Sequence, residues 1–148
     1  MNIYVVRPDG SWYSRPDITL VRDADRFCLP GDCTEALACR GCCIHIAKAG
    51  KAIAPRFARR YFDSWASAIL FYGRTGGGLT PYLDRATWVD REFRPVTELD
   101  EDLCARIVHI LEQLSLHLSL RIGDFLIFEQ GEPTPLQRGD HFDTIEIL

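Results

Sequence analysis

Sulfur and imidazole side chains gather in one short stretch of the sequence, where Cys39, Cys42, Cys43 and His45 lie close together. Thiolate and imidazole groups are the ligands that zinc prefers, and a structural zinc site needs four of them in a tetrahedron. On a β-strand, however, Cys42 points away from the other three, and Cys39 and Cys43 lie ~13 Å apart. The surrounding sequence ALACRGCCIHI is small and apolar, which is typical of a core strand. The cysteines are therefore interpreted as small buried hydrophobic side chains, with a zinc site as the alternative.

Other arrangements of reactive side chains give weaker signals. The four histidines lie on unrelated predicted elements, and no serine lies in the strand-to-helix turn of a hydrolase nucleophile. The triplet Gly76–Gly78 lacks the lysine and the helix start of a phosphate-binding loop. We interpret the triplet as a flexible connector. The basic residues between Lys48 and Arg60 are interpreted as a solvent-exposed helix face.

The composition limits the classes of protein to consider. A chain of 148 residues with 47% hydrophobic and 26% charged residues suits one globular domain. The net charge of −4 gives no electrostatic reason to expect nucleic acid or an anionic membrane as a partner. The start MNIYVVRPDG lacks the regions of a signal peptide, and no run approaches the ~20 apolar residues of a membrane span. We therefore expect a cytoplasmic protein whose cysteines are thiols or ligands rather than disulfides.

The elements that position these residues are organised around the stretch at 50–74. Gly50 is expected to adopt the left-handed dihedral angles of a turn. A helix is predicted over Pro55–Asp63, because Phe57 and Tyr61 recur at helical spacing. The apolar run Ala66–Tyr72 then predicts a strand that is buried on both faces.

The rest of the pattern predicts a chain made mostly of strands, with one more helix. That helix is predicted over Asp100–Leu114 with Asp100 as its N-cap, and the alternation of polar residues and leucines at 115–120 is interpreted as its end. A kink or bulge is expected at Gly41. The predicted strands and extended segments are Asn2–Val6, Ile18–Val21, Phe27–Pro30, Ala36–Ile46, Tyr82–Val89, Phe125–Phe128 and Phe142–Leu148.

In this pattern the chain resembles the fumarylacetoacetate hydrolase family, also called the 2-hydroxyhepta-2,4-diene-1,7-dioate isomerase family. The residues that match the family segment GK-x-I-x-x-x-FA-x-RYY and the strand after it are Gly50, Lys51, Ile53, Phe57, Ala58, Arg60, Tyr61, Phe62, Phe71 and Arg74. The Arg15-Pro16 element and the pairs Gly123-Asp124 and Gly139-Asp140 also match. The resemblance implies an α+β fold, mostly β, with the family's mixed β-sandwich roll and two helices. It implies a single domain over residues 1–148, shortened around 75–100.

The resemblance also implies where a catalytic site would lie. Family members bind a divalent metal, usually magnesium, through a Glu-x-Glu pair and an Asp, and the metal acts as a Lewis acid on a 2-oxo or enol group. Counting back from Gly50 places the pair at Cys39 and Gly41, and the Asp falls at Leu70. None of these three residues is a carboxylate, so an intact magnesium site is not expected.

Other positions of the family site are only partly kept. Arg74 is present, and Asp84 remains from a Lys-x-Phe-Asp element, while the family's catalytic histidine falls near Leu37. Using Glu35 as a ligand instead needs an insertion, and it supplies one carboxylate where three are needed. The degenerate site positions are therefore Cys39, Gly41, Leu70, Arg74 and Asp84.

The sequence thus favours a non-catalytic relative of fumarylacetoacetate hydrolase-type enzymes that binds a protein partner or a small carboxylic acid and needs no cofactor. The alternative is a divergent hydrolase, isomerase or decarboxylase of 2-oxo acids that uses Mg or Mn. Family members pair through this domain, and a shortened sheet should uncover apolar surface. A homodimer, or a heterodimer with an active relative, is therefore expected.

Overall fold

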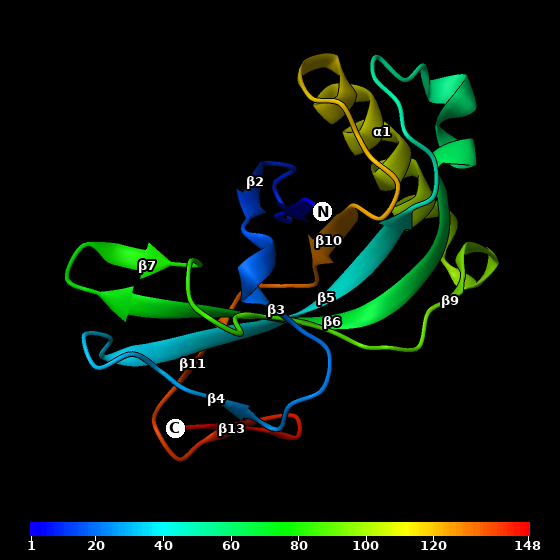
Figure 1. Cartoon of the computed structure of the whole chain (residues 1–148). Helices are drawn as coiled ribbons and strands as arrows, with labels where there is room; N and C mark the ends of the chain where they lie inside the picture. Colours follow the sequence, from blue (N-terminus) through cyan, green and yellow to red (C-terminus); the bar gives the residue numbers. More distant parts are fainter.

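The computed structural model describes residues 1–148, and its main feature is one strongly curved, mixed β-sheet (Figure 1). In sheet order its main strands are β2 (Trp12–Arg15), β1 (Ile3–Val6), β10 (Phe125–Glu129), β5 (Glu35–Ile46), β6 (Phe62–Thr75), β8 (Thr87–Val89) and β3 (Leu20–Val21). β11 (Thr134–Leu136) pairs with β5, while β7 (Gly78–Thr80) and β9 (Arg94–Pro95) pair with β6. A second sheet contains β12 (His141–Phe142), β13 (Ile145–Ile147) and β4 (Arg26–Phe27). The expected α+β, mostly β roll is confirmed.

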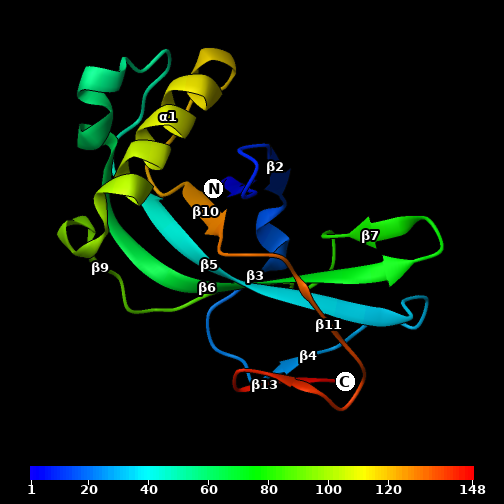
Figure 2. The ribbon, with the colours of Figure 1, turned by 180° about the vertical axis from the view of Figure 1, so that it is seen from behind.

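The two longest strands, β5 and β6, form an antiparallel ladder that runs through the whole molecule (Figure 2). β5 is buried along nearly its full length, which explains its alanines, cysteines and glycine. The predicted kink at Gly41 is wrong, because the ladder is regular there and its one irregularity lies between His45 and Ile46. A Cβ at Gly41 would lie 2.9 Å from Ile127 Cγ2 and 3.3 Å from Phe128 O. Close packing against β10 therefore explains this glycine.

The α-helix α1 (Glu101–His117) covers one end of this ladder. Its N-cap is Asp100, whose carboxylate accepts a hydrogen bond from Leu103 N at 2.7 Å, as predicted. The predicted end at Leu114 is wrong, because Ser115 is buried within the last turn and its hydroxyl accepts a hydrogen bond from Ile53 N at 2.9 Å. The polar residue in the alternating pattern thus faces the core. No helix is long and apolar enough to cross a membrane.

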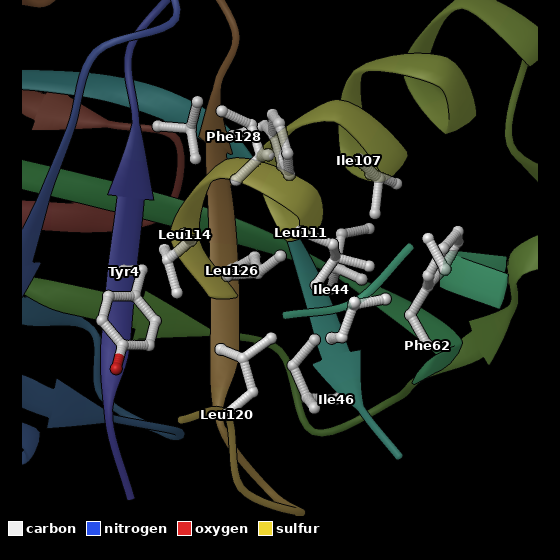
Figure 3. Close-up of a cluster of buried hydrophobic side chains, with 14 of the residues drawn as sticks. Tyr4, Ile44, Ile46, Phe62, Ile107, Leu111, Leu114, Leu120, Leu126 and Phe128 are labelled. Carbon is white, nitrogen blue, oxygen red and sulfur yellow. The ribbon is translucent and has the colours of Figure 1, made fainter. Parts of the chain in front are cut away.

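The apolar stripe of α1 packs against the sheet in the largest hydrophobic cluster (Figure 3). Leu111 and Leu114 of the helix share this cluster with Ile44 and Ile46 of β5 and Leu126 of β10. Farther along the ladder, Ala36 and Ala38 of β5 and Phe71 of β6 instead pack against the small sheet, where Phe71 stacks on Phe27 with ring centroids 4.4 Å apart. The opposite face of the ladder points into the roll and carries a third cluster.

The segment before β6 differs from its prediction. It forms a 3-10 helix, η2 (Pro55–Tyr61), and not a helix to Asp63. The left-handed residue of the preceding loop is Ala52, with a φ of 51°, while Gly50 has no positive φ. A Cβ at Gly50 would overlap the Tyr61 ring. Glycine is needed at this position for the close approach of that ring, and not for a left-handed turn.

Several short strands also differ from prediction. The first half of the predicted strand Ile18–Val21 lies in a 3-10 turn, η1 (Asp17–Thr19), and only Leu20 and Val21 form a strand, β3. β2 precedes that turn where no strand was predicted. The predicted last strand Phe142–Leu148 is a tight hairpin in which Asp143 has a φ of 56°. Within Tyr82–Val89 only β8 is a strand. Gly76 and Gly77 of the glycine triplet form the turn of the β6–β7 hairpin, and Gly78 begins β7, where it pairs with Thr75.

The two glycine–aspartate pairs are turns of one design. Gly123 and Gly139 have φ angles of 91° and 93°, which explains the glycine in each pair. The fully buried Asp124 carboxylate accepts hydrogen bonds from Asn2 N at 2.8 Å and from the backbone N of Arg121 at 2.9 Å. The first pair thus ties the N-terminus to the start of β10, the strand that carries Glu129.

Candidate functional site

The three positions that the sequence assigned to the family metal site lie together in the structure. Cys39 and Gly41 alternate along β5 and so point to one face, and Leu70 lies directly opposite Cys39 on β6. This face is the inside of the roll, and Cys39 and Leu70 belong to its hydrophobic cluster. The ladder therefore places all three sequence-derived positions at one point of the fold.

The side chains of Cys39, Gly41 and Leu70 do not fit a divalent metal of this kind, which needs oxygen ligands. Leu70 is fully buried, and Gly41 has no room even for a Cβ. Burial raises the pKa of the Cys39 thiol to about 12, with the nearby Glu129 adding to the shift and Arg15 opposing it. The thiol is therefore neutral at physiological pH. No group of three His, Cys, Asp or Glu side chains could hold a metal ion.

The other two predicted site positions, Arg74 and Asp84, lie away from this point. Arg74 is at the exposed end of the ladder, where its Nε donates a hydrogen bond to Glu35 Oε1 at 2.6 Å. The other oxygen of Glu35 accepts from Gln137 Nε2 at 3.4 Å. Asp84 is exposed in the loop before β8. Glu35, the alternative ligand, is thus the partner of Arg74.

The structure does not gather the four residues of the zinc alternative. Cys42 belongs to the cluster under α1, while Cys39 and Cys43 lie inside the roll. His45 is engaged elsewhere, with Nδ1 2.9 Å from Asp63 Oδ1. The prediction that the three cysteines are buried is confirmed, since each is at most 3% exposed. Burial also raises the pKa of Cys42 to about 11 and that of Cys43 well above its usual value.

A chain of buried polar groups fills the roll beside Cys39 and is the feature that sequence reasoning missed. Arg15 Nε donates to Tyr13 Oη at 3.0 Å, the Tyr13 and Tyr72 hydroxyls lie 2.8 Å apart, and the Tyr72 hydroxyl donates to the Glu129 carboxylate. Because an ionised carboxylate only accepts hydrogen bonds, each hydroxyl donates toward Glu129. The chain joins β2, β6 and β10. Burial raises the pKa of both tyrosines, so they are neutral donors.

Arg15 also closes the roll. Its Nη1 donates to Ala86 O at 2.9 Å and contacts Thr87 Oγ1 at 3.3 Å. The Thr87 hydroxyl lies 2.9 Å from that of Thr19, on the turn that follows β2. β2 has no backbone pairing with β8 or β3, so these side chains hold the two edges of the sheet together.

The sequence carried only faint signals of this network. Arg15 stands out as part of the Arg15-Pro16 element, but its family match suggested no contact with Tyr13 or Tyr72. Glu129 ends the apolar run FLIFE, and a carboxylate that ends a buried strand is a sign of a polar interior. Nothing in the spacing links the two, because the chain between them is more than a hundred residues long.

A groove lies on the other face of β6. It has a volume of about 580 Å³ and runs between β6, β8 and the β12–β13 hairpin. Ser67, Ile69 and Trp88 line it, and an ion pair between Arg40 Nη1 and Asp143 Oδ2 at 3.3 Å lies at its edge. The groove is therefore separate from the inside of the roll and from Cys39, Gly41 and Leu70.

Comparison with solved structures places this architecture among known folds. No protein-family model matches the sequence, and no curated protein matches it. Fumarylpyruvate hydrolase from Pseudomonas aeruginosa, in complex with Mn2+ and pyruvate, superposes with a TM-score of 0.75 over 94% of this chain and 82% of its own, at 12% identity. Maleylpyruvate hydrolase from Sphingobium sp. SYK-6 gives a TM-score of 0.77 over 99% of this chain and 70% of its own, at 14% identity.

A third match is 2-hydroxyhepta-2,4-diene-1,7-dioate isomerase from Mycobacterium marinum, with a TM-score of 0.72, 15% identity, and coverage of 93% of this chain and 67% of its own. The chain has the fumarylacetoacetate hydrolase fold. At these identities the likeness concerns the fold and not the activity. The fold expected from the Gly50–Arg74 stretch is thus confirmed, while the residue-by-residue equivalence of Cys39, Gly41 and Leu70 stays a prediction.

The polar chain generates a first prediction. Replacing Tyr72 with Phe removes the hydroxyl between Tyr13 and Glu129 and leaves the buried Glu129 carboxylate without that donor. We expect Tyr72→Phe to lower the free energy of unfolding by ~1–3 kcal/mol in urea denaturation. Tyr82→Phe, at a position that is 60% exposed, is the matched control, and it should change stability by less than ~0.5 kcal/mol. Equal effects of the two substitutions would contradict the network.

The buried thiols generate a second prediction. In the native protein a thiol reagent should label Cys28 rapidly, because it is the one exposed cysteine, and the other five only on unfolding. Cys28→Ser should abolish the fast phase. Rapid native labelling of Cys39, Cys42 and Cys43 would contradict the core assignment.

The raised pKa values of Cys39 and Cys42 also predict a dependence of stability on pH. The unfolded chain loses these thiol protons at a lower pH than the folded protein, so the free energy of unfolding should fall as pH rises from about 9 toward about 12.

Proposed function

We propose that this protein is a non-catalytic relative of fumarylacetoacetate hydrolase-type enzymes that acts by binding a protein partner or a small acid. One observation carries the proposal: Cys39, Gly41 and Leu70 meet at one point inside the roll and offer no oxygen ligand there. The neutral Cys39 thiol cannot replace a carboxylate, and packing against Ile127 leaves no space at Gly41. The fold would then serve as a scaffold for recognition. A cytoplasmic location stays part of this proposal.

The alternative is a divergent metal-dependent hydrolase, isomerase or decarboxylase of 2-oxo acids. It is favoured by the similarity to the Pseudomonas fumarylpyruvate hydrolase, whose structure contains Mn2+ and pyruvate. Such an enzyme would need its Mg or Mn ligands at other positions of this chain. Glu35 and Asp84 are the carboxylates to consider, but the half-buried Glu35 is already bound to Arg74.

Metal binding and turnover separate the two functions. We expect calorimetry with magnesium or manganese to show no saturable site, and acylpyruvate hydrolysis and oxaloacetate decarboxylation to remain at background, because one misplaced ligand already weakens such a site. The Pseudomonas fumarylpyruvate hydrolase serves as the positive control for the acylpyruvate assay. A micromolar metal site that disappears in Glu35→Ala would instead support the enzyme, with Glu35 as a ligand.

We also propose that the protein pairs with a second copy or with an active relative. Support comes from β7, which pairs only with β6 and carries Leu79, 46% exposed, near Tyr82, 60% exposed. An edge strand with apolar side chains and no protecting charge favours association. A specific interface of this kind buries at least ~1,000 Å² in total.

Light scattering at micromolar concentration tests the pairing. We expect a mass of twice 16.8 kDa for the protein alone, or a complex when an active relative is present. Leu79→Glu should dissociate it, because a charge at this edge is costly to bury. Ile18→Glu, at a 73% exposed position on η1, should leave the mass unchanged. A mass that stays at 16.8 kDa both for the protein alone and with an active relative present would rule the pairing out.

A further inference from the structure

The guanidinium group of Arg15 has an unmet hydrogen-bonding capacity deep inside the roll. Arg15 is 2% exposed, and its Nη2 atom has no hydrogen-bond partner. The other two nitrogens are engaged, Nε with Tyr13 and Nη1 with Ala86 O and Thr87. Two N–H bonds of a permanently charged group are therefore left without an acceptor.

No carboxylate neutralises this charge directly. Arg15 takes part in none of the ion pairs of the chain. The buried Glu129 is linked to it only through two tyrosine hydroxyls. The Tyr72 ring lies 4.8 Å from the guanidinium carbon and supplies part of the compensation. A buried arginine without a contacting counter-ion is costly, and an unsatisfied buried donor indicates a bound group or water at that point.

A second unpaired cation lies toward the surface on the same tyrosine. The guanidinium carbon of Arg7 lies 4.4 Å from the centroid of the Tyr13 ring, and Arg7 forms no ion pair. Arg7 and Tyr13 are both half-buried, whereas Arg15 behind them is buried. Arg7 near the surface and Arg15 in the interior place two positive charges one after the other, and together they attract a negatively charged group along this route.

We propose that Nη2 of Arg15 donates its hydrogen bonds to a small bound monoanion, of halide or formate size, that enters past Arg7 and Tyr13. This inference names a ligand class for the proposed binding function and rests on it. The ligand must be small because the Tyr13 and Tyr72 rings lie against this guanidinium and are themselves packed in the hydrophobic cluster inside the roll. A halide and a short carboxylate share the needed chemistry, which is one compact negative acceptor for a planar N–H group.

Anomalous diffraction locates the anion directly. Crystals of the whole chain are grown without halide and soaked in sodium bromide or in sodium formate. A bromide peak within hydrogen-bonding distance of Arg15 Nη2 is the expected result, and formate density at the same point identifies a carboxylate source. Only water at Nη2, or bromide only at exposed arginines such as Arg26 and Arg91, would overturn the proposal.

Thermal unfolding at constant ionic strength tests the site in solution. With chloride, bromide or formate in tenfold excess over Kd, the melting temperature should rise by about 3–5 °C relative to the larger methanesulfonate. Arg15→Lys should abolish this dependence on the anion, and Arg7→Gln should weaken it severalfold. Arg91→Gln removes a cation from an exposed ion pair with Asp23 and should leave the dependence unchanged.

The outcomes are separable from those of the proposed function. If Arg15→Lys is too unstable to measure, Arg7→Gln and the crystals still decide the question. Identical anion dependence in the wild type and Arg7→Gln, with no density at Nη2, would refute the anion site. Metal-dependent turnover would refute the non-catalytic function, whether or not the anion is found.

Discussion

The buried guanidinium of Arg15 is the interaction on which the roll depends. The large sheet begins at β2 and ends at β8 and β3, yet no backbone hydrogen bonds join these edges. Arg15 spans the gap by donating to Ala86 O and Thr87 while its Nε contacts Tyr13. A planar group with several fixed donors suits this task, because it can bind two strands in one geometry. A lysine could not make these contacts together.

The same group explains how this fold can be filled without carboxylates at Cys39, Gly41 and Leu70. The inside of the roll holds one positive charge at Arg15 and one negative charge at Glu129, joined by neutral tyrosine hydroxyls. These hydrogen bonds order the interior from within the chain. The neighbouring positions can then be apolar and closely packed, which the fully buried Leu70 illustrates.

Close packing on both faces of the β5–β6 ladder sets the side chains that its strands can carry. α1 and the small sheet share one face, and the inside of the roll takes the other. A Cβ at Gly41 would meet Ile127, and one at Gly73 would lie 2.7 Å from Cys33 Sγ. Gly41 and Gly73 therefore lie where a neighbouring segment packs too closely against the ladder to leave room for a side chain. The groove by Trp88 is left where the two sheets separate.

The sequence by itself determined the elements whose signals are local. The N-cap at Asp100, the apolar stripe of α1 and the burial of β5 follow from residue spacing, and the Gly50–Arg74 stretch indicated the fold. The prediction from sequence ended α1 too early and wrongly placed a kink at Gly41. Both features depend on tertiary contacts, of Ser115 with Ile53 and of Gly41 with Ile127.

The candidate site was predicted only in part. Counting from Gly50 identified positions that β5 and β6 do bring together, because an antiparallel ladder converts spacing into register. Only the tertiary structure decided what surrounds them. Tyr13, Arg15, Tyr72 and Glu129 come from three strands that are distant in sequence, and closure of the roll makes them neighbours. No local pattern records such a contact, since its energy arises from burial and charge in three dimensions.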